Sequence, residues 1–249
     1  MSLQGTPVWY ELTTTDPNAA QDFYARVLGW TFKDSGMVDF DYRIGHAGDV
    51  GVCGVMAPPE VGMPPRWGIY FAVDNCDATA KAVSDAGGKV CHGPADIPNV
   101  GRFAVLADPQ GAIFAVLQAT DGDGHAFDQM KQGHGNWHEL STTDPKAALD
   151  FYGRIFAWKA GRAMDMGAMG TYQLFSHEGR DIGGMMPLGQ APAPIWIPYF
   201  GTSGAEAAVS HITAAGGTVL HGPAEVPGGA FIVSARDPQG AEFAVVGPK

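Results

Sequence analysis

Two carboxylates lie beside tryptophans at matching positions in the chain. Trp9 and Glu11 are two residues apart, and Trp137 and Glu139 repeat this spacing. Residues i and i+2 of a β-strand point to the same face of a sheet, so each indole is expected beside its carboxylate. A carboxylate on a mostly apolar strand is suited to removing a proton from a bound molecule. Glu11 and Glu139 are therefore the predicted catalytic residues.

A structural role is equally compatible with both glutamates. Each could hydrogen-bond to a neighbouring module of the fold, through Arg26 in the first case or Arg154 in the second. The two adjoining tryptophans could likewise line a pocket or fill a core. For Trp67 and Trp196, strand alternation favours the core.

The strands that carry the glutamates belong to an internal repeat. The segment from Trp9, WYELTTTDPNAAQDFYARVLGW, returns from Trp137 as WHELSTTDPKAALDFYGRIFAW. A second segment, GGKVCHGPADIPNVGRFAVLADPQGAIFAVL from Gly87, returns from Gly216 as GGTVLHGPAEVPGGAFIVSARDPQGAEFAVV. The polar, glycine-rich stretch between the copies has no counterpart. We therefore expect domain 1 over residues 1–120, a linker over 121–133 and domain 2 over 134–249.

Each repeat is predicted to begin with a strand and a helix. A strand over 8–13 leads to Thr15-Asp16-Pro17, where a capping side chain precedes a proline suited to the first helical turn. Apolar residues then recur on one helix face, and Gly29 is placed to end the helix in a left-handed conformation. In the copy Ala157 stands at this position, so that helix is expected to end differently.

The pattern then continues with short strands and restarts. Strands are expected around residue 32 and over 40–44 and 50–56, followed by a strand over 67–73 and a helix over 76–86. Strands over 89–91, 103–106 and 113–118 follow, the last two joined by the turn Asp108-Pro109-Gln110-Gly111. The chain therefore predicts an α+β fold of four βαβββ modules.

These motifs resemble the vicinal-oxygen-chelate superfamily, which includes glyoxalases, bleomycin-resistance proteins and extradiol dioxygenases. The resemblance rests on the Thr-Asp-Pro helix start, on the Phe-Tyr and Gly-Trp that follow it, and on the Asp-Pro-x-Gly turn before the last strand. It covers nearly the whole chain and occurs twice. It implies two glyoxalase-like domains whose curved mixed sheets enclose cups, in which relatives commonly hold a metal.

The resemblance also implies where metal ligands would lie. These positions hold Trp9, Gly68 and Ala115 in the first repeat and Trp137, Ile197 and Ala244 in the second. An indole nitrogen only donates hydrogen bonds and cannot ligate a metal. Both repeats lack the usual His and Glu set of a divalent-metal site, so no metal residue is predicted and the cofactor stays unassigned.

Other aromatic and polar side chains are expected to line the cups. Tyr70 and Tyr199 share a strand face with two of the ligand positions, and Glu242 shares that of a third. His92 and His221 lie in matching His-Gly-Pro turns, where they either touch a ligand or are simply exposed. The predicted ligand-binding residues are Trp9, Tyr70, His92, Trp137, Tyr199, His221 and Glu242.

Two functions fit these observations. The first is a lyase or isomerase that acts on a small oxygenated molecule with an inward glutamate as base. The alternative is a non-catalytic protein that sequesters a drug or metabolite between aromatic walls, as bleomycin-resistance proteins do. A metal-dependent dioxygenase is the least favoured because the usual ligand set is missing.

Composition narrows the partners. The net charge is −11, from 15 basic and 26 acidic side chains, which disfavours nucleic acid and anionic membranes as partners and leaves a small molecule. The chain has no apolar run of membrane-spanning length and no N-terminal targeting pattern, so a cytoplasmic location is expected. The fused repeats favour a monomer with an internal pseudo-dimer, or a weak homodimer.

Overall fold

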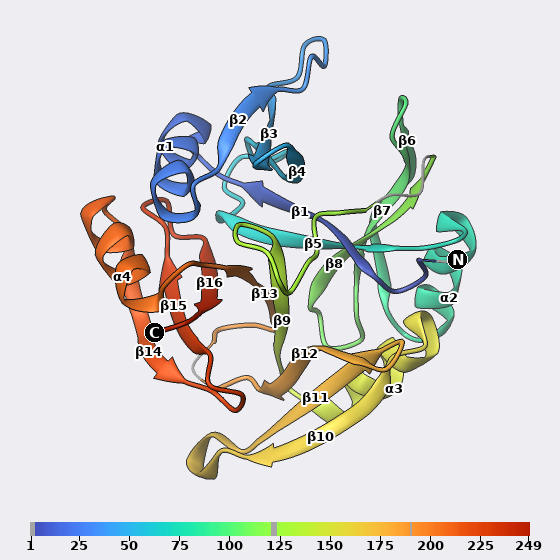
Figure 1. The fold of residues 1–249 in the computed structure, drawn as a ribbon. Coiled ribbons are helices and arrows are strands. Elements are labelled where there is room, and N and C mark those ends of the chain that lie inside the picture. Colours follow the sequence, from blue (N-terminus) through green and yellow to red (C-terminus); the bar gives the residue numbers. More distant parts are fainter. Residues whose placement is uncertain (1–2, 121–123, 190) are drawn as a thin grey trace. The chain divides into compact units, whose positions relative to one another are not determined.

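The protein is described by a computed structural model that covers residues 3–120, 124–189 and 191–249 (Figure 1). The first repeat contains β1 (Pro7–Thr13), α1 (Pro17–Leu28), β2 (Thr31–Asp34), β3 (Tyr42–Ala47), β4 (Val50–Met56), β5 (Arg66–Ala72), α2 (Cys76–Asp85), β6 (Lys89–Ile97), β7 (Gly101–Ala107) and β8 (Ile113–Ala119).

The second repeat follows the same order. It contains β9 (Gly135–Thr142), α3 (Pro145–Phe156), β10 (Lys159–Asp165), the short 3₁₀ helix η1 (Gly167–Met169), β11 (Thr171–His177), β12 (Arg180–Pro187), β13 (Ile195–Gly201), α4 (Ala205–Ala214), β14 (Thr218–Glu225), β15 (Phe231–Arg236) and β16 (Glu242–Gly247). The α+β fold of four βαβββ modules is confirmed.

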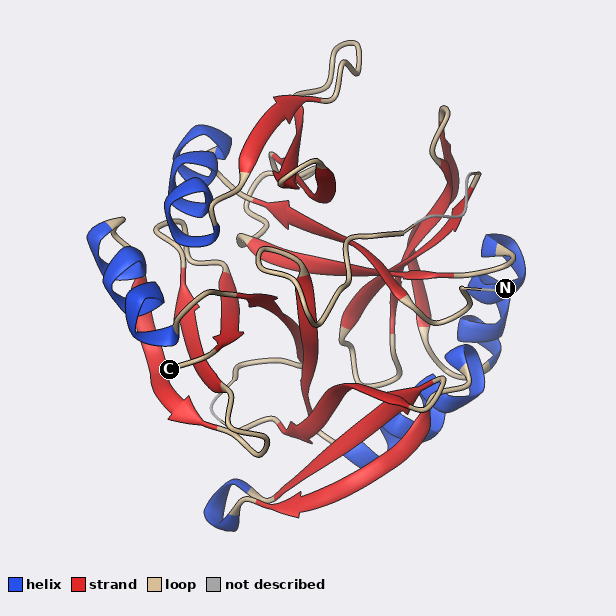
Figure 2. Ribbon diagram, in the orientation of Figure 1, coloured by secondary structure: helices blue, strands red, loops and turns tan. Residues whose placement is uncertain are grey.

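The strands form two eight-stranded mixed sheets (Figure 2). Their strand orders are β2-β3-β4-β1-β5-β8-β7-β6 and β10-β11-β12-β9-β13-β16-β15-β14. Within a module the first and last strands are parallel, as β1 and β4 are, whereas consecutive strands such as β3 and β4 are antiparallel. The parallel pair is possible because the helix between them makes the long crossover that a parallel connection needs.

The chain divides into two compact units that do not coincide with the repeats. The inner unit consists of Met1–Val8, Ile69–Gly124 and Trp137–Trp196, and so holds most of the second and third modules. The outer unit consists of Trp9–Gly68, His125–Asn136 and Ile197–Lys249, and holds most of the first and fourth. The division into domains 1–120 and 134–249 stays a prediction. Residues 121–123 of the expected linker lie outside the described part.

A buried chain of hydrogen bonds holds each unit together. In the outer unit the indole of Trp67 donates to Tyr24 Oη (2.9 Å), which donates to Asp237 Oδ2 (3.1 Å). In the inner unit Trp196 donates to Tyr152 Oη (3.0 Å), which donates to Asp108 Oδ2 (3.1 Å). The core positions predicted for the two tryptophans are confirmed.

The aspartates in these chains also shape the Asp-Pro-Gln-Gly turns. Asp108 Oδ1 accepts from the backbone N–H groups of Gln110 and Ala112, both at 2.9 Å. Burial raises the pKa of the Asp108 and Asp237 carboxyl groups, and the hydrogen bonds that they accept partly offset this rise. The turn at Asp237 is thereby bonded to α1 of the first repeat, and the turn at Asp108 is bonded to α3 of the second repeat.

The helix starts and one helix end follow the sequence prediction, and the other end does not. Asp16 and Asp144 cap α1 and α3 by accepting from N–H groups three residues ahead, at 3.0 and 2.9 Å. Gly29 ends α1 at a φ of 71°. Ala157 ends α3 at a φ of 59°. The expectation that α3 ends differently is wrong, because the alanine adopts the same left-handed conformation despite its Cβ.

This pair of helix ends gives a reciprocal prediction. Ala157→Gly is expected to stabilise the protein by about 1 kcal/mol, because glycine has no Cβ to strain a left-handed backbone. Gly29→Ala is expected to destabilise it by a similar amount, although no neighbouring atom would obstruct the new Cβ. Chemical denaturation of both variants measures the shifts. Equal signs for the two shifts would contradict backbone strain as the cause.

Candidate functional site

Glu11 lies at the end of an ordered chain of hydrogen bonds in the outer unit. The indole Nε1 of Trp9 donates to Tyr42 Oη at 2.9 Å, and Tyr42 Oη donates to Glu11 Oε2 at 3.1 Å. The directions are fixed because an indole N–H only donates, so the tyrosine gives its own proton to the carboxylate. All three side chains are half-buried. The carboxylate is thus oriented by its own module.

The inner unit repeats this arrangement. Trp137 Nε1 donates to Tyr172 Oη at 2.9 Å, and Tyr172 Oη donates to Glu139 Oε2 at 3.0 Å. We call each set a Trp–Tyr–Glu triad. The pairing of Trp9 with Glu11 and of Trp137 with Glu139, predicted from their spacing, is therefore extended by a tyrosine between them.

Strand register explains how the tyrosine reaches the glutamate. Glu11 on β1 pairs with Gly54 on β4, which pairs in turn with Ile44 on β3. Tyr42, two residues before Ile44, crosses β4 above Gly54. A Cβ at Gly54 would overlap the tyrosine ring and hydroxyl. In the second triad Gly184 pairs with Glu139 and leaves the same space below Tyr172.

The two tyrosines keep their protons near neutral pH. Burial raises the pKa of Tyr42 well above its usual value, and the charge of Glu11 raises it further. Burial and the charge of Glu139 have the same effect on the pKa of Tyr172. Each hydroxyl is therefore a lasting proton donor to its carboxylate, and each triad presents an oriented acceptor beside aromatic rings.

The tyrosines and the glycines beneath them were missed by the sequence analysis. Tyr42 lies within an expected strand, and Tyr172 is its counterpart in the second repeat. The available signal was a glycine inside a strand in both repeats, at Gly54 and Gly184. Such glycines mark places where another group approaches the backbone closely.

The remaining predicted ligand-binding residues lie in varied surroundings. Tyr70 and Tyr199 are buried, at 6% and 4% exposure. His92 and His221 are exposed, and the ring of His92 lies 5.4 Å from that of Phe103. Glu242 pairs with Arg236 at 2.8 Å. Ligand binding by these five residues stays a prediction.

His138 lies between Trp137 and Glu139 on β9. It is fully buried, and its Nδ1 lies 2.8 Å from the carbonyl oxygen of Ile182. Burial lowers the pKa of this imidazole to about 4. Its neighbour in sequence, Glu139, accepts from Tyr172 in the second triad. The two side chains therefore have different hydrogen-bond partners.

Two arginines offered as alternative partners of the glutamates line small grooves at helix ends. Arg26 lines a groove of about 200 Å³ in the outer unit, together with Gly29 and His211. Arg154 lines one of about 250 Å³ in the inner unit, together with Gln4 and Asn75. Tyr42 and Tyr172 each donate a hydrogen bond to the glutamate of their own triad.

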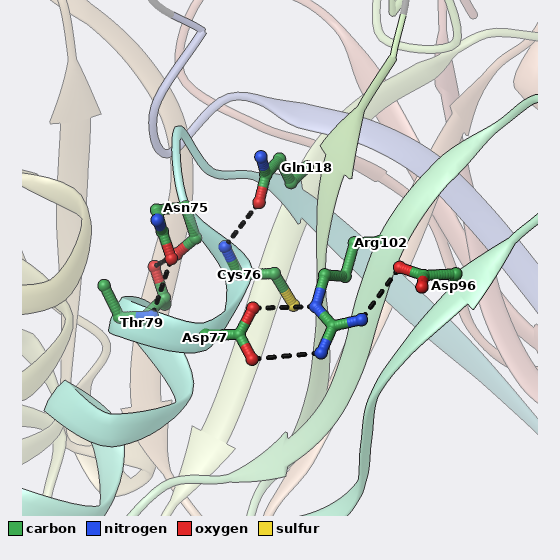
Figure 3. A network of polar contacts seen from close by, with 8 residues as sticks. Asn75, Cys76, Asp77, Thr79, Asp96, Arg102 and Gln118 are labelled. Carbon is green, nitrogen blue, oxygen red and sulfur yellow. Dashed lines mark hydrogen bonds and ion pairs between the residues drawn. The ribbon is translucent and has the colours of Figure 1, made fainter.

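A charged network distinguishes the two repeats at Arg102 (Figure 3). Its guanidinium donates to both carboxylate oxygens of Asp77, at 2.7 and 3.0 Å, and to Asp96 at 2.8 Å. These bonds tie the β6–β7 hairpin to the first turn of α2. Phe231 replaces the arginine in the second repeat, so this tie belongs to the first repeat. Both carboxylates are exposed, so solvent screens these ion pairs and they are expected to contribute little to stability.

The residues at the family's metal-ligand positions do not fit a resident metal. Trp9 and Trp137 each use their single N–H to donate to a tyrosine. Ala115 and Ala244 pair with Tyr70 and Tyr199 across the sheet, and an alanine side chain has no atom that can ligate a metal. Among the described residues, no group of three or more His, Cys, Asp or Glu is placed to hold a metal ion.

Two segments of the chain match a known family. Residues 6–116 and 134–245 each match the Glyoxalase/Bleomycin resistance protein/Dioxygenase superfamily. The chain belongs to this superfamily. The resemblance inferred from the sequence motifs is confirmed, and the repeated match agrees with the tandem arrangement of two glyoxalase-like domains.

Curated relatives cover almost the whole chain. A Mycobacterium tuberculosis protein named "Putative glyoxylase CFP32" is 35% identical over 98% of this chain and 95% of its own length. The anthracycline biosynthesis protein DnrV of Streptomyces peucetius is 32% identical over 97% of this chain and 93% of its own.

Solved structures agree on the fold. The Mn(II)-bound glyoxalase from Novosphingobium aromaticivorans gives a TM-score of 0.71 at 16% identity, with 99% of this chain and 83% of that one covered. The 2,3-dioxygenase LapB from Pseudomonas sp. KL28 gives 0.69 at 12% identity, with 99% and 93% covered. Within the described residues, no helix is long and apolar enough to span a membrane.

Proposed function

We propose that the protein is a lyase or isomerase that acts on a small oxygenated molecule, with Glu11 and Glu139 as general bases. The observation that carries the proposal is the Trp–Tyr–Glu triad, present in both repeats with the same hydrogen-bond directions. The name of the mycobacterial relative, "Putative glyoxylase CFP32", supports an enzyme of the glyoxalase-like group.

The triad supplies both groups that such a reaction needs. The glutamate takes a proton from a carbon beside a carbonyl, and the electron pair of the broken C–H bond moves into the carbonyl to form an enolate. The glutamate is then neutral and a weaker acceptor, so the tyrosine hydroxyl is released to donate to the enolate oxygen. When the attacked carbon carries a hydroxyl, the proton of that hydroxyl passes to the enolate oxygen. The glutamate then returns its proton to the former carbonyl carbon, so the carbonyl moves to the adjacent carbon and the carboxylate is restored.

Exchange of carbon-bound hydrogen in D₂O tests this step directly. Hydroxyacetone and dihydroxyacetone are the probes, and loss of their ¹H NMR signals is compared with buffer alone. We expect the wild-type protein to accelerate exchange and the double variant Glu11→Gln/Glu139→Gln to lose about 10²- to 10⁴-fold of the rate. Each single variant reports the share of its own repeat.

The control is Glu206→Gln, at a carboxylate whose side chain is 66% exposed at the start of α4. It is expected to exchange at the wild-type rate. A wild-type rate no faster than buffer, or a double variant as fast as wild type, would refute the glutamates as bases.

Sequestration of an aromatic or cationic molecule is the second candidate function. Half-buried Trp9 and Tyr42 and the net charge of −11 favour it. Quenching of tryptophan fluorescence by a panel of aromatic cations measures such binding. Saturable quenching without hydrogen exchange would support sequestration, and a flat response across the panel would exclude it.

Location and assembly also stay proposals. We expect a cytoplasmic protein that is monomeric, since each compact unit already combines modules from both repeats. Sedimentation velocity over a range of concentrations separates a monomer from a weak homodimer.

A further inference from the structure

A groove in the outer unit lies between two helices that pack side by side, α1 and α4 (Figure 1). Its volume is about 200 Å³, and its lining includes Arg26 from α1 and His211 from α4. Gln132, Thr202 and Ser203 add an amide and two hydroxyl groups. Among the described residues that line it, none belongs to a triad. Since pockets for drug-sized molecules begin at about 300 Å³, the groove suits a small polar group.

The inner unit has a counterpart of this groove, at matching positions of the repeat. There Arg154 of α3 is the counterpart of the outer groove's arginine. Asp74 and Ala82 line the inner groove at the positions that Ser203 and His211 occupy in the outer one. The inner groove therefore combines one cationic side chain with one acid. The described lining of the outer groove has an arginine and a histidine and no acid.

An arginine in the last turn of a helix has a role of its own. Its positive charge interacts favourably with the carbonyl end of the helix, and both α1 and α3 have an arginine there. The arginine alone therefore indicates no ligand. The feature particular to the outer groove is the serine in place of an aspartate and the histidine in place of an alanine. Both differences make the outer groove more favourable to an anion.

The charge of the whole protein acts against an anion, so the groove must offset it locally. The net charge is −11, which repels anions at a distance. At physiological ionic strength, charges more than about 8 Å away are largely screened, and the side chains that line the groove then decide. Within the described part of the chain, Arg26 forms no ion pair with a carboxylate. Its guanidinium can therefore bind a ligand.

The donors in the outer groove match the oxygens of a phosphate group. A guanidinium presents its N–H groups as a fork that fits two phosphate oxygens at once. The imidazole N–H and the two hydroxyls can donate to the remaining oxygens. A carboxylate has only two oxygens, both in one plane, and would leave some of these donors unused.

We propose that the groove between α1 and α4 binds a phosphate group, with Arg26 and His211 as its principal donors. The group belongs either to free phosphate or to a small phosphomonoester, which present the same oxygens. This inference goes beyond the proposed function, because the groove and the triads share no described residue.

An NMR titration of the ¹⁵N-labelled full chain with inorganic phosphate tests the site. Sodium chloride keeps the ionic strength constant throughout. We expect saturable shifts of the Arg26 Nε–H and the Ser203 amide, with one phosphate bound per chain. Shifts that do not saturate, or that spare both groups, would overturn the proposal.

Variants at matching positions of the two grooves assign the binding. Arg26→Gln removes the charge, and Ser203→Asp introduces the acid of the inner groove; each is expected to weaken phosphate binding about tenfold or more. An acid just before a helix is favourable to that helix, so Ser203→Asp is expected to fold. Arg154→Gln, the same change in the inner groove, is the control and is expected to keep wild-type affinity. Wild-type affinity in both outer-groove variants would refute the assignment.

A second probe separates the two sources of the phosphate group. Glycerol 1-phosphate carries the group on a small alcohol. Tighter binding than inorganic phosphate would assign a phosphomonoester to the groove, and equal or weaker binding would assign free phosphate. Either result supports the site if Arg26→Gln weakens binding. Glycerol 1-phosphate binding that is unchanged in Arg26→Gln would count against it.

Discussion

Replacement of Gly54 by alanine is expected to destabilise the protein by about 1–3 kcal/mol and to break the hydrogen bond between Tyr42 and Glu11. A Cβ at this position overlaps the tyrosine ring, so either the ring or the strand must move. Urea denaturation measures the loss of stability. The exchange assay is expected to lose the share of the first triad, because Glu11 no longer has its orienting donor.

The control comes from a glycine in the same unit. Gly68 lies on β5, and a Cβ there would meet the Glu11 carbonyl oxygen at 3.7 Å, an ordinary contact. Gly68→Ala is therefore expected to keep nearly wild-type stability. The double variant Gly54→Ala/Tyr42→Ala removes the overlap, so its cost should be less than the sum of the single costs. Additive costs would show that the overlap is not the cause.

Acid is expected to weaken the fold through His138. The unfolded imidazole binds a proton near its usual pKa of about 6.5, whereas burial holds the folded pKa at about 4. The stability contributed by the neutral ring is therefore complete above pH 6.5 and is lost as the pH falls toward 4. The shift corresponds to about 3 kcal/mol.

His138→Asn isolates this contribution. Asparagine offers an amide donor for the Ile182 carbonyl but does not titrate in this range. The variant is expected to lose less stability than the wild type between pH 6.5 and pH 4, although it is less stable at neutral pH because it leaves unfilled volume. The exposed His221→Asn serves as the control. Parallel stability profiles for wild type and His138→Asn would contradict the assignment.

Much of the fold could be predicted from short sequence motifs. Asp16 followed by a proline marked the start of α1, and the duplicated segments marked the second repeat, since both are written in neighbouring residues. The prediction for the end of α3 was wrong because Ala157 adopts the left-handed conformation, although its Cβ disfavours it. Local propensity is a weak guide where packing decides.

Only part of the site could be predicted from the sequence, for a related reason. The two-residue spacing of Trp9 and Glu11 gave their common face, but the tyrosine between them comes from a strand two positions away in the sheet. Which residue of β3 crosses β4 depends on strand register, and register is set by pairing between distant segments. Gly54 is the residue in the sequence that indicates this crossing, because a larger side chain there would overlap Tyr42.

The pairing of modules determines when, during synthesis, each module can pack against its partner. Tyr24 and Asp237 meet in one compact unit although 213 positions separate them. At about 5–20 residues per second, the ribosome needs roughly 10–40 s to pass from one to the other. All of the inner unit except its first segment, Met1–Val8, is synthesised within that interval. The first module to leave the ribosome is thus the last to meet its partner, and its apolar helix face lacks that partner until the fourth module has been made.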